Sequence, residues 1–129
     1  FVAGLHAGKM FNTFPMMNGD VLPTGGWVTA LGIENIFNNP ATVQFIHRFF
    51  AFAIVFVVGK IYLLSKHSAV TRLQDIAVKF LLVSISIQFL LGILTVLYQA
   101  PITLSSLHQI GAFFLFMATI LTVFRFRTH

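Results

Sequence analysis

Long apolar stretches dominate the chain and predict helices that cross a membrane. Three of them, at roughly 42–64, 76–98 and 102–124, reach the about 20 apolar residues that a helix needs to span a bilayer. Residues 1–8 are also apolar, and we expect them to be the end of a helix that starts before them. The pattern therefore predicts an all-α fold: a transmembrane helix bundle with three full spans and a truncated first helix.

The segment 9–41 interrupts this pattern and is expected to be a long loop outside the membrane. It contains three of the four prolines, several glycines and the run Asn18-Gly19-Asp20. Residues 27–37 mix apolar and polar side chains and begin with Trp, which is enriched at membrane interfaces, so we expect a short interfacial helix there. Asn39 precedes a proline and should end this helix, and Thr42 is expected to open the next one.

The composition supports an integral membrane protein. Hydrophobic residues make up 57% and charged residues only 9% of the 129 residues, and the mean hydropathy is +0.91, whereas soluble domains have about 25% charged residues. The net charge of +5 does not predict nucleic-acid binding, because the basic residues lie at helix ends and in one loop. The chain has no cysteine, which excludes disulfides, thiolate haem ligands and covalent c-type haem attachment within it.

The distribution of Lys and Arg predicts the orientation of the spans. The loop 65–75 and the C-terminal end carry Lys66, Arg72, Arg125 and Arg127, whereas the loop 9–41 carries only Lys9. By the positive-inside rule the loop 65–75 and the C-terminal end face the cytoplasm or an equivalent matrix. The expected location is a bacterial inner membrane or a mitochondrial inner membrane, with membrane lipid as the surrounding partner.

Two histidines, His47 and His108, lie inside predicted spans and are the main functional candidates. An ionisable side chain within a bilayer is costly and is by default a candidate for function, and imidazole is a common metal ligand and the usual axial ligand of haem iron. The two residues lie about five and six positions inside the outer ends of their helices, at depths of ~8 and ~9 Å. This match predicts that they are the two axial ligands of one iron, in a haem b cofactor.

The residues around the two histidines leave some alternatives open. Ala51 and Ala112 follow them at i+4, with Gly111 beside the latter, and these small side chains either make room for a flat macrocycle or allow close helix packing. Arg48 either binds a haem propionate or extends to the lipid headgroups. A polar stripe on the middle span, which should face protein, consists of Ser84, Gln88, Gly92 and Thr95.

Within this stripe Gln88 either orients a ligand or packs helices together. His6 lies near the outer end of the truncated helix and takes no role, and His67 and His129 are expected to be solvated. The acids Asp20, Glu34 and Asp75 lie in loops or at a helix edge. No paired carboxylates, phosphate-binding glycine loop or nucleophile motif is present, so no catalytic residue is assigned.

Three segments of the chain resemble the haem A synthase family. FVAGLHAGKMFNTFPMM resembles the end of the family's fifth helix and the loop that follows, FNNPATVQFIHRFFA its next helix with the His-Arg pair, and QFLLGILTVLYQAPITLSSLHQIGA its last two helices. Each motif is weak alone, but together they are spread from residue 1 to residue 112, so the resemblance runs over nearly the whole chain. The chain is therefore similar to the C-terminal half of an eight-helix membrane enzyme built from two four-helix halves.

The resemblance implies a function and a set of ligands. The family is an oxidoreductase of haem A biosynthesis that oxidises the C8 methyl group of haem O to a formyl group. It implies that His47 and His108 ligate a haem b, while the N-terminal half, absent here, supplies the haem O pocket and a catalytic acid. A homo-oligomer and contact with haem O synthase are further expectations.

Two other readings of the residues stay open. The first is a small b-type cytochrome that relays electrons, which would use the same haem site. The second is a non-redox membrane protein, a transport or assembly segment in which the two histidines serve packing or a proton relay.

Overall fold

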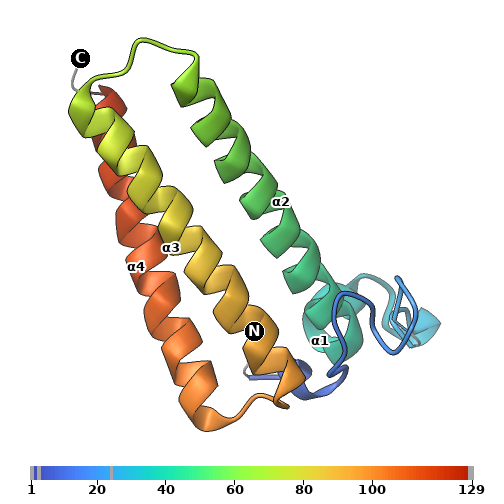
Figure 1. The fold of residues 1–129 in the computed structure, drawn as a ribbon. Helices are drawn as coiled ribbons and strands as arrows, with labels where there is room; N and C mark the ends of the chain where they lie inside the picture. The colour runs from blue at the N-terminus through green and yellow to red at the C-terminus, as the bar shows by residue number, and fades with distance from the viewer. Residues whose placement is uncertain (1, 3, 24, 128–129) are drawn as a thin grey trace.

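The computed structural model describes residues 2, 4–23 and 25–127, and all regular structure in this part of the chain is helical. The elements in chain order are a 3-10 helix Ala7–Lys9, a second 3-10 helix Thr29–Glu34, α1 (Asn35–Asn38), α2 (Pro40–Lys66), α3 (Arg72–Leu97) and α4 (Ile102–Arg127). Helices α3 and α4 run antiparallel and pack along their length, and α2 packs on α3 (Figure 1). The predicted all-α class and three long spans are confirmed.

The three long helices have the length and composition of membrane spans. Their most apolar windows have mean hydropathies of 1.9, 2.5 and 1.8, and only 11%, 17% and 11% of the residues in these windows are buried by protein. An apolar helix with so little protein cover must face lipid over most of its surface. The chain is therefore part of a multi-pass membrane protein.

Local hydrogen bonds explain why two of the spans begin earlier than predicted. The Asn39 side chain accepts from the Ala41 amide at 3.0 Å, and Pro40 occupies the first turn of α2, which together are typical of a helix start. The start of α2 is thus two residues before Thr42. Helix α3 begins with a capping box, in which the Thr71 hydroxyl accepts from the Gln74 amide at 3.3 Å and the Gln74 side chain accepts from the Thr71 amide at 2.9 Å.

The segment 9–41 lies at the end of the bundle where α2 begins and α3 gives way to α4 (Figure 1). The predicted interfacial helix is present as two short pieces, Thr29–Glu34 and α1. Asn35 is completely buried and holds this segment together: its side chain accepts from the Val28 amide at 2.8 Å and donates to the Gly32 carbonyl at 2.7 Å. The described residues of 1–8 form turns and the start of the 3-10 helix Ala7–Lys9, so the end of a longer helix expected there is not seen in these residues.

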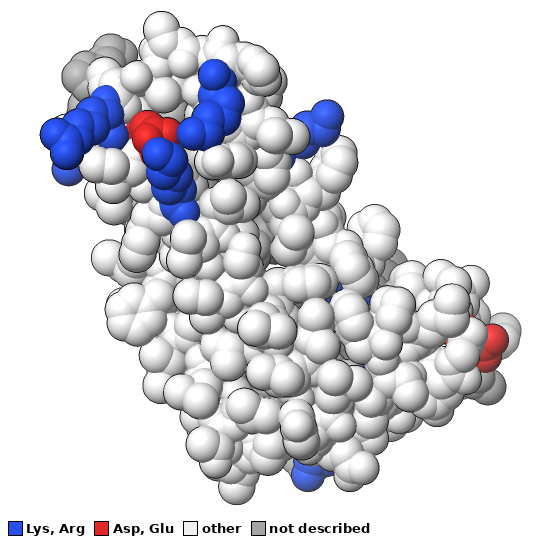
Figure 2. All heavy atoms as spheres, in the orientation of Figure 1, with Lys and Arg blue, Asp and Glu red and all other residues white. Residues whose placement is uncertain are grey.

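The basic residues gather at the opposite end, where α2 ends and α3 begins (Figure 2). Asp75 lies between two of them, with its carboxylate 2.6 Å from the Lys79 Nζ and 4.0 Å from the Lys66 Nζ. Exposed ion pairs of this kind contribute little to stability, because water screens them. The asymmetry of charge between the two ends is the pattern on which the predicted orientation rests.

A small apolar core joins the three long helices at a distance from the segment 9–41, which we call the outer segment. It consists of Val58, Leu81, Ile85 and Ala118, with Val55, Leu82 and Leu115 packed against it. Ala118 is 1% exposed at the α3–α4 contact, and its small side chain permits the close approach of these two helices.

Enlarging this contact should destabilise the helix pair. We predict that Ala118→Leu lowers the free energy of unfolding by about 1–3 kcal/mol, because extra methylene groups in a packed site force side chains off their rotamers. The measurement is thermal unfolding in detergent, followed by circular dichroism. Ala112→Leu is the matched control, since Ala112 lies on the same helix but is exposed. An equal loss of stability in both variants would contradict the packing described here.

Candidate functional site

The imidazoles of His47 on α2 and His108 on α4 face each other. Their ring centroids lie 6.3 Å apart and their planes are inclined by 80°. Among the described residues no Cα of α2 comes within 8 Å of a Cα of α4, so the two side chains reach toward each other from helices whose backbones stay apart. The proximity that the matched depths predict is confirmed.

This spacing is the one expected for two imidazoles on opposite sides of one metal. A metal–imidazole bond is about 2.0–2.1 Å long, and the nitrogen lies about 1.1 Å from the centre of a five-membered ring with bonds of about 1.33 Å. The two ring centroids would then be about 6.3 Å apart. An edge-to-face aromatic pair falls within the same range of about 4.5–7 Å, so the surroundings of the rings must also be considered.

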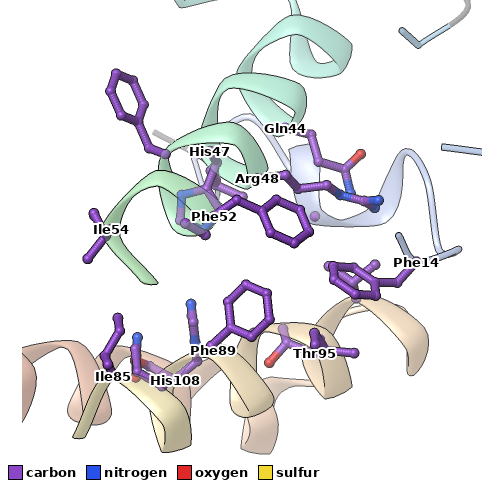
Figure 3. Close-up of a pocket in the computed structure, with 18 of the residues that line it drawn as sticks. Phe14, Gln44, His47, Arg48, Phe52, Ile54, Ile85, Phe89, Thr95 and His108 are labelled. Carbon is purple, nitrogen blue, oxygen red and sulfur yellow. The ribbon is translucent and has the colours of Figure 1, made fainter. Parts of the chain in front are cut away.

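Both imidazoles border an apolar cavity of about 250 Å³ (Figure 3). The cavity is bordered by α2, α3 and α4 and by Val2, Gly8 and Phe14. Most of its lining residues are apolar, and its polar side chains besides the two histidines are Gln44, Arg48, Gln88 and Thr95. An apolar cavity with a few convergent polar groups is the usual form of a cofactor site.

The donor set fits a tetrapyrrole better than a bare metal ion. No group of three or more His, Cys, Asp or Glu side chains is placed to hold a metal within residues 2, 4–23 and 25–127. The two imidazoles supply two ligands, which is the number left open when a macrocycle provides the other four. In addition, the Nδ1 atom of His108 is buried without a hydrogen-bond partner among the described residues, which is unusual unless a ligand completes its surroundings.

At the contact between α3 and α4, two glycines, one on each helix, make room for polar side chains next to the cavity. A Cβ at Gly92 would lie 3.1 Å from the Cε1 atom of His108, and a Cβ at Gly111 would collide with the Oε1 atom of Gln88. The Gln88 amide donates to the His108 backbone carbonyl at 2.9 Å. The α3–α4 contact is therefore shaped around the His108 side chain and the Gln88 amide.

Arg48 points to the outer segment and is buried, with 8% of its surface exposed. Its guanidinium donates to the backbone carbonyls of Phe11 at 2.7 Å and Thr13 at 2.8 Å. The adjacent Gln44 pairs with both backbone groups of Phe11, at 3.1 and 2.9 Å. The expectation that Arg48 extends to lipid headgroups is wrong, because these carbonyls hold it inside. Its Nε atom is buried and has no partner among the described residues.

Three phenylalanines pack together along the cavity. The Phe14 ring stacks on Phe52 with centroids 5.8 Å apart, and Phe89 meets both edge-on at 6.0 and 5.4 Å. Phe14 comes from the outer segment, Phe52 from α2 and Phe89 from α3. All three line the cavity that His47 and His108 border (Figure 3). This aromatic wall ties the outer segment to the helices and limits the access of water.

Other residues singled out from the sequence lie in varied places. Ala51 lines the cavity, whereas Ala112 is exposed and does not line it, so the idea that both alanines make room for a macrocycle holds for Ala51 alone. His6 and His67 are exposed. His129 lies outside the described residues.

Several residues that shape the site were not recognised from the sequence. Gln44 and the aromatic wall of Phe14, Phe52 and Phe89 depend on the outer segment folding back on α2, and this contact leaves no periodic signal. Gly92 was noted only as part of a polar stripe. Its i+4 spacing from Gln88 was the available signal, because glycine inside a helix costs stability and implies a close approach.

Comparison with known proteins identifies the family. Residues 1–120 match the family model COX15-CtaA, described as cytochrome oxidase assembly protein. The chain is 40% identical to the heme A synthase of Flavobacterium johnsoniae over 127 residues, which cover 97% of the chain and 37% of that protein. It is 38% identical to the heme A synthase of Nitrosomonas eutropha over 119 residues, covering 92% of the chain and 33% of the relative.

The heme A synthase of Paracoccus denitrificans is 40% identical over 117 residues, covering 89% of the chain and 30% of the relative. The chain thus spans about a third of the length of these curated relatives. No solved structure matches it. The match to the family model over most of its length shows that the chain belongs to the COX15-CtaA family of cytochrome oxidase assembly proteins.

Proposed function

We propose that this chain is the haem-b-binding part of a haem A synthase and serves haem A biosynthesis. The observation that carries the proposal is the facing pair of imidazoles, 6.3 Å apart, at an apolar cavity between membrane-spanning helices. The relatives' printed name, heme A synthase, supports a role in haem A synthesis, and the oxidation of the C8 methyl group of haem O to a formyl group is the reaction that the family resemblance implies. On this proposal the substrate pocket and the catalytic acid would lie in the part of those relatives that this chain does not match.

The chain's own residues hold the cofactor and set its surroundings. His47 and His108 would hold the haem iron, each through one ring nitrogen. The haem supplies one-electron redox chemistry when bound, and its potential depends on axial ligation and burial. The Phe and Ile side chains of the cavity exclude water and provide an environment of low dielectric constant.

Arg48 is the residue we assign to a haem propionate. It is a buried cation whose described hydrogen-bond partners are neutral carbonyls, and its Nε atom has none. A buried charge is costly until it is paired, and guanidinium matches carboxylate geometry. The position of Arg48 at the outer end of the cavity therefore favours a propionate at that end.

The ligand assignment predicts the optical spectrum of the protein. The purified wild-type protein should show the sharp α and Soret bands of low-spin haem on reduction. His47→Ala and His108→Ala should each lose the low-spin signature and lower the haem content, because one axial ligand is removed. His67→Ala is the control, since His67 is exposed at the far end of α2.

Unchanged haem content in His47→Ala would refute the assignment, and a colourless wild-type preparation would favour the non-redox alternative. The sequence upstream in the gene separates the remaining two readings. A second four-helix half with its own histidine pair supports the synthase, whereas a stand-alone reading frame supports a cytochrome that relays electrons.

The propionate assignment can be tested with haem dimethyl ester, in which both carboxylates are masked. We predict that the wild-type protein binds the ester about 10–100-fold more weakly than haem, because a hydrogen bond to a charged group contributes about 1.5–3 kcal/mol. In Arg48→Leu this preference should disappear. Equilibrium titration of the apoprotein by absorbance gives both affinities, and a preference that survives in Arg48→Leu would contradict the role of Arg48.

A further inference from the structure

We propose that Gln88 is a positioning residue for His108, and that Gly92 and Gly111 provide the space in which it acts. The proposal rests on the proposed haem site, because the exact placement of the imidazole matters only if it is a ligand. Gln88 does not itself reach the iron. It acts through the backbone and the environment of His108.

The first observation is a hydrogen bond from one helix to the ligand-bearing residue of another. The Gln88 Nε2 atom on α3 donates to the backbone carbonyl of His108 on α4 at 2.9 Å. Gln88 is 8% exposed in the middle of its span. A buried amide in a membrane helix is costly unless it is paired. The Gln88 Nε2 atom pairs with the backbone of the residue that carries the imidazole, whereas its Oε1 atom is buried without a partner among the described residues.

The second observation is that two glycines are placed where a Cβ would require the polar side chain opposite it to shift. Gly111 is one turn beyond His108 on α4, and a Cβ there would collide with the Gln88 Oε1 atom. Gly92 is one turn beyond Gln88 on α3, and a Cβ there would lie 3.1 Å from the imidazole of His108. Each helix thus has a gap that receives a polar side chain of the other.

A third contact holds the preceding turn of α4. The Thr95 hydroxyl donates to the Leu91 carbonyl at 2.7 Å and lies 3.4 Å from the carbonyl of Leu104, four residues before His108. Gln88, Gly92 and Thr95 share one face of α3 at helical spacing. Gln88 thus contacts the backbone of His108 itself, and Thr95 contacts the backbone one turn before it. Gly92, which lies between Gln88 and Thr95 on α3, leaves space for the imidazole.

The two histidines are held differently. The polar side chains next to His47 on α2, Gln44 and Arg48, hydrogen-bond to the backbone of the outer segment. In the described part of the chain, the side-chain hydrogen bonds of α2 run to the outer segment or stay within the helix, and none reaches α3 or α4. His108 is thus placed by polar contacts from α3, whereas His47 depends on the packing of α2. The height and rotation of His108 should therefore respond to changes at Gln88.

A second explanation is that Gln88 merely holds α3 and α4 together, and Thr122 provides a matched control for it. The Thr122 hydroxyl on α4 lies 3.3 Å from the Ala77 carbonyl on α3, in the same helix contact but outside the cavity. Thr122→Val removes a polar group between the same two helices. Gln88→Met removes the amide but keeps an unbranched side chain of similar length.

The experiment measures haem affinity by titration of the apoprotein in detergent, and the spin state of the bound iron by electron paramagnetic resonance. We expect Gln88→Met to weaken haem binding about 10–100-fold, the usual effect of losing a group that orients a ligand, and to convert part of the low-spin signal to high-spin. Thr122→Val should leave both readouts unchanged. Equal effects of the two variants, or no effect of Gln88→Met, would overturn the proposal.

Gly111→Ala tests the geometry with Gln88 still present. The new methyl group displaces the amide, so this variant should weaken haem binding in the wild-type background but have little further effect in Gln88→Ala, where nothing is left to displace. Equal effects in both backgrounds would overturn the proposal. Each of these results can be obtained while the wild-type protein retains low-spin haem, so the positioning role can fail with the haem site intact. A wild-type protein without haem binding would refute both.

Discussion

The central feature of the site is that two imidazoles lie close together although the helices that carry them do not pack against each other. His47 and His108 come from α2 and α4, whose backbones stay more than 8 Å apart in the described part of the chain, yet their rings lie 6.3 Å apart. His47 is exposed and His108 is half-buried, and both border the cavity. A ligand bound between them would connect α2 to α4.

Several polar side chains elsewhere in the spans pair with backbone. Gln44 and Arg48 bind the carbonyls of the outer segment, and Gln88 binds the carbonyl of His108. Such pairing satisfies the side chains in a medium without water, and it also places the elements that border the cavity. Four buried side-chain atoms lack a partner among the described residues: Arg48 Nε, Gln88 Oε1 and His108 Nδ1, which belong to residues that line the cavity, and Asn12 Oδ1, which does not.

The spans and the histidine pair could be predicted from the sequence, because both depend on local and one-dimensional information: the length of an apolar run and the depth of a residue within it. The start of α2 was misplaced by two residues, since Asn39 caps the helix through a hydrogen bond that hydropathy does not reveal. The role of Arg48 in holding Phe11 and Thr13 was missed for a different reason. It needs the outer segment to fold back over α2, and residues more than 30 positions apart must meet for that.

The most direct test of the account is an experimental structure of the haem-loaded protein, with the iron located by its anomalous scattering. We expect a single iron between the rings of His47 and His108, coordinated by one nitrogen of each, with the macrocycle bordered by Phe52 and Phe89. An iron held by another residue, or a haem bound with both rings turned away from it, would contradict the account.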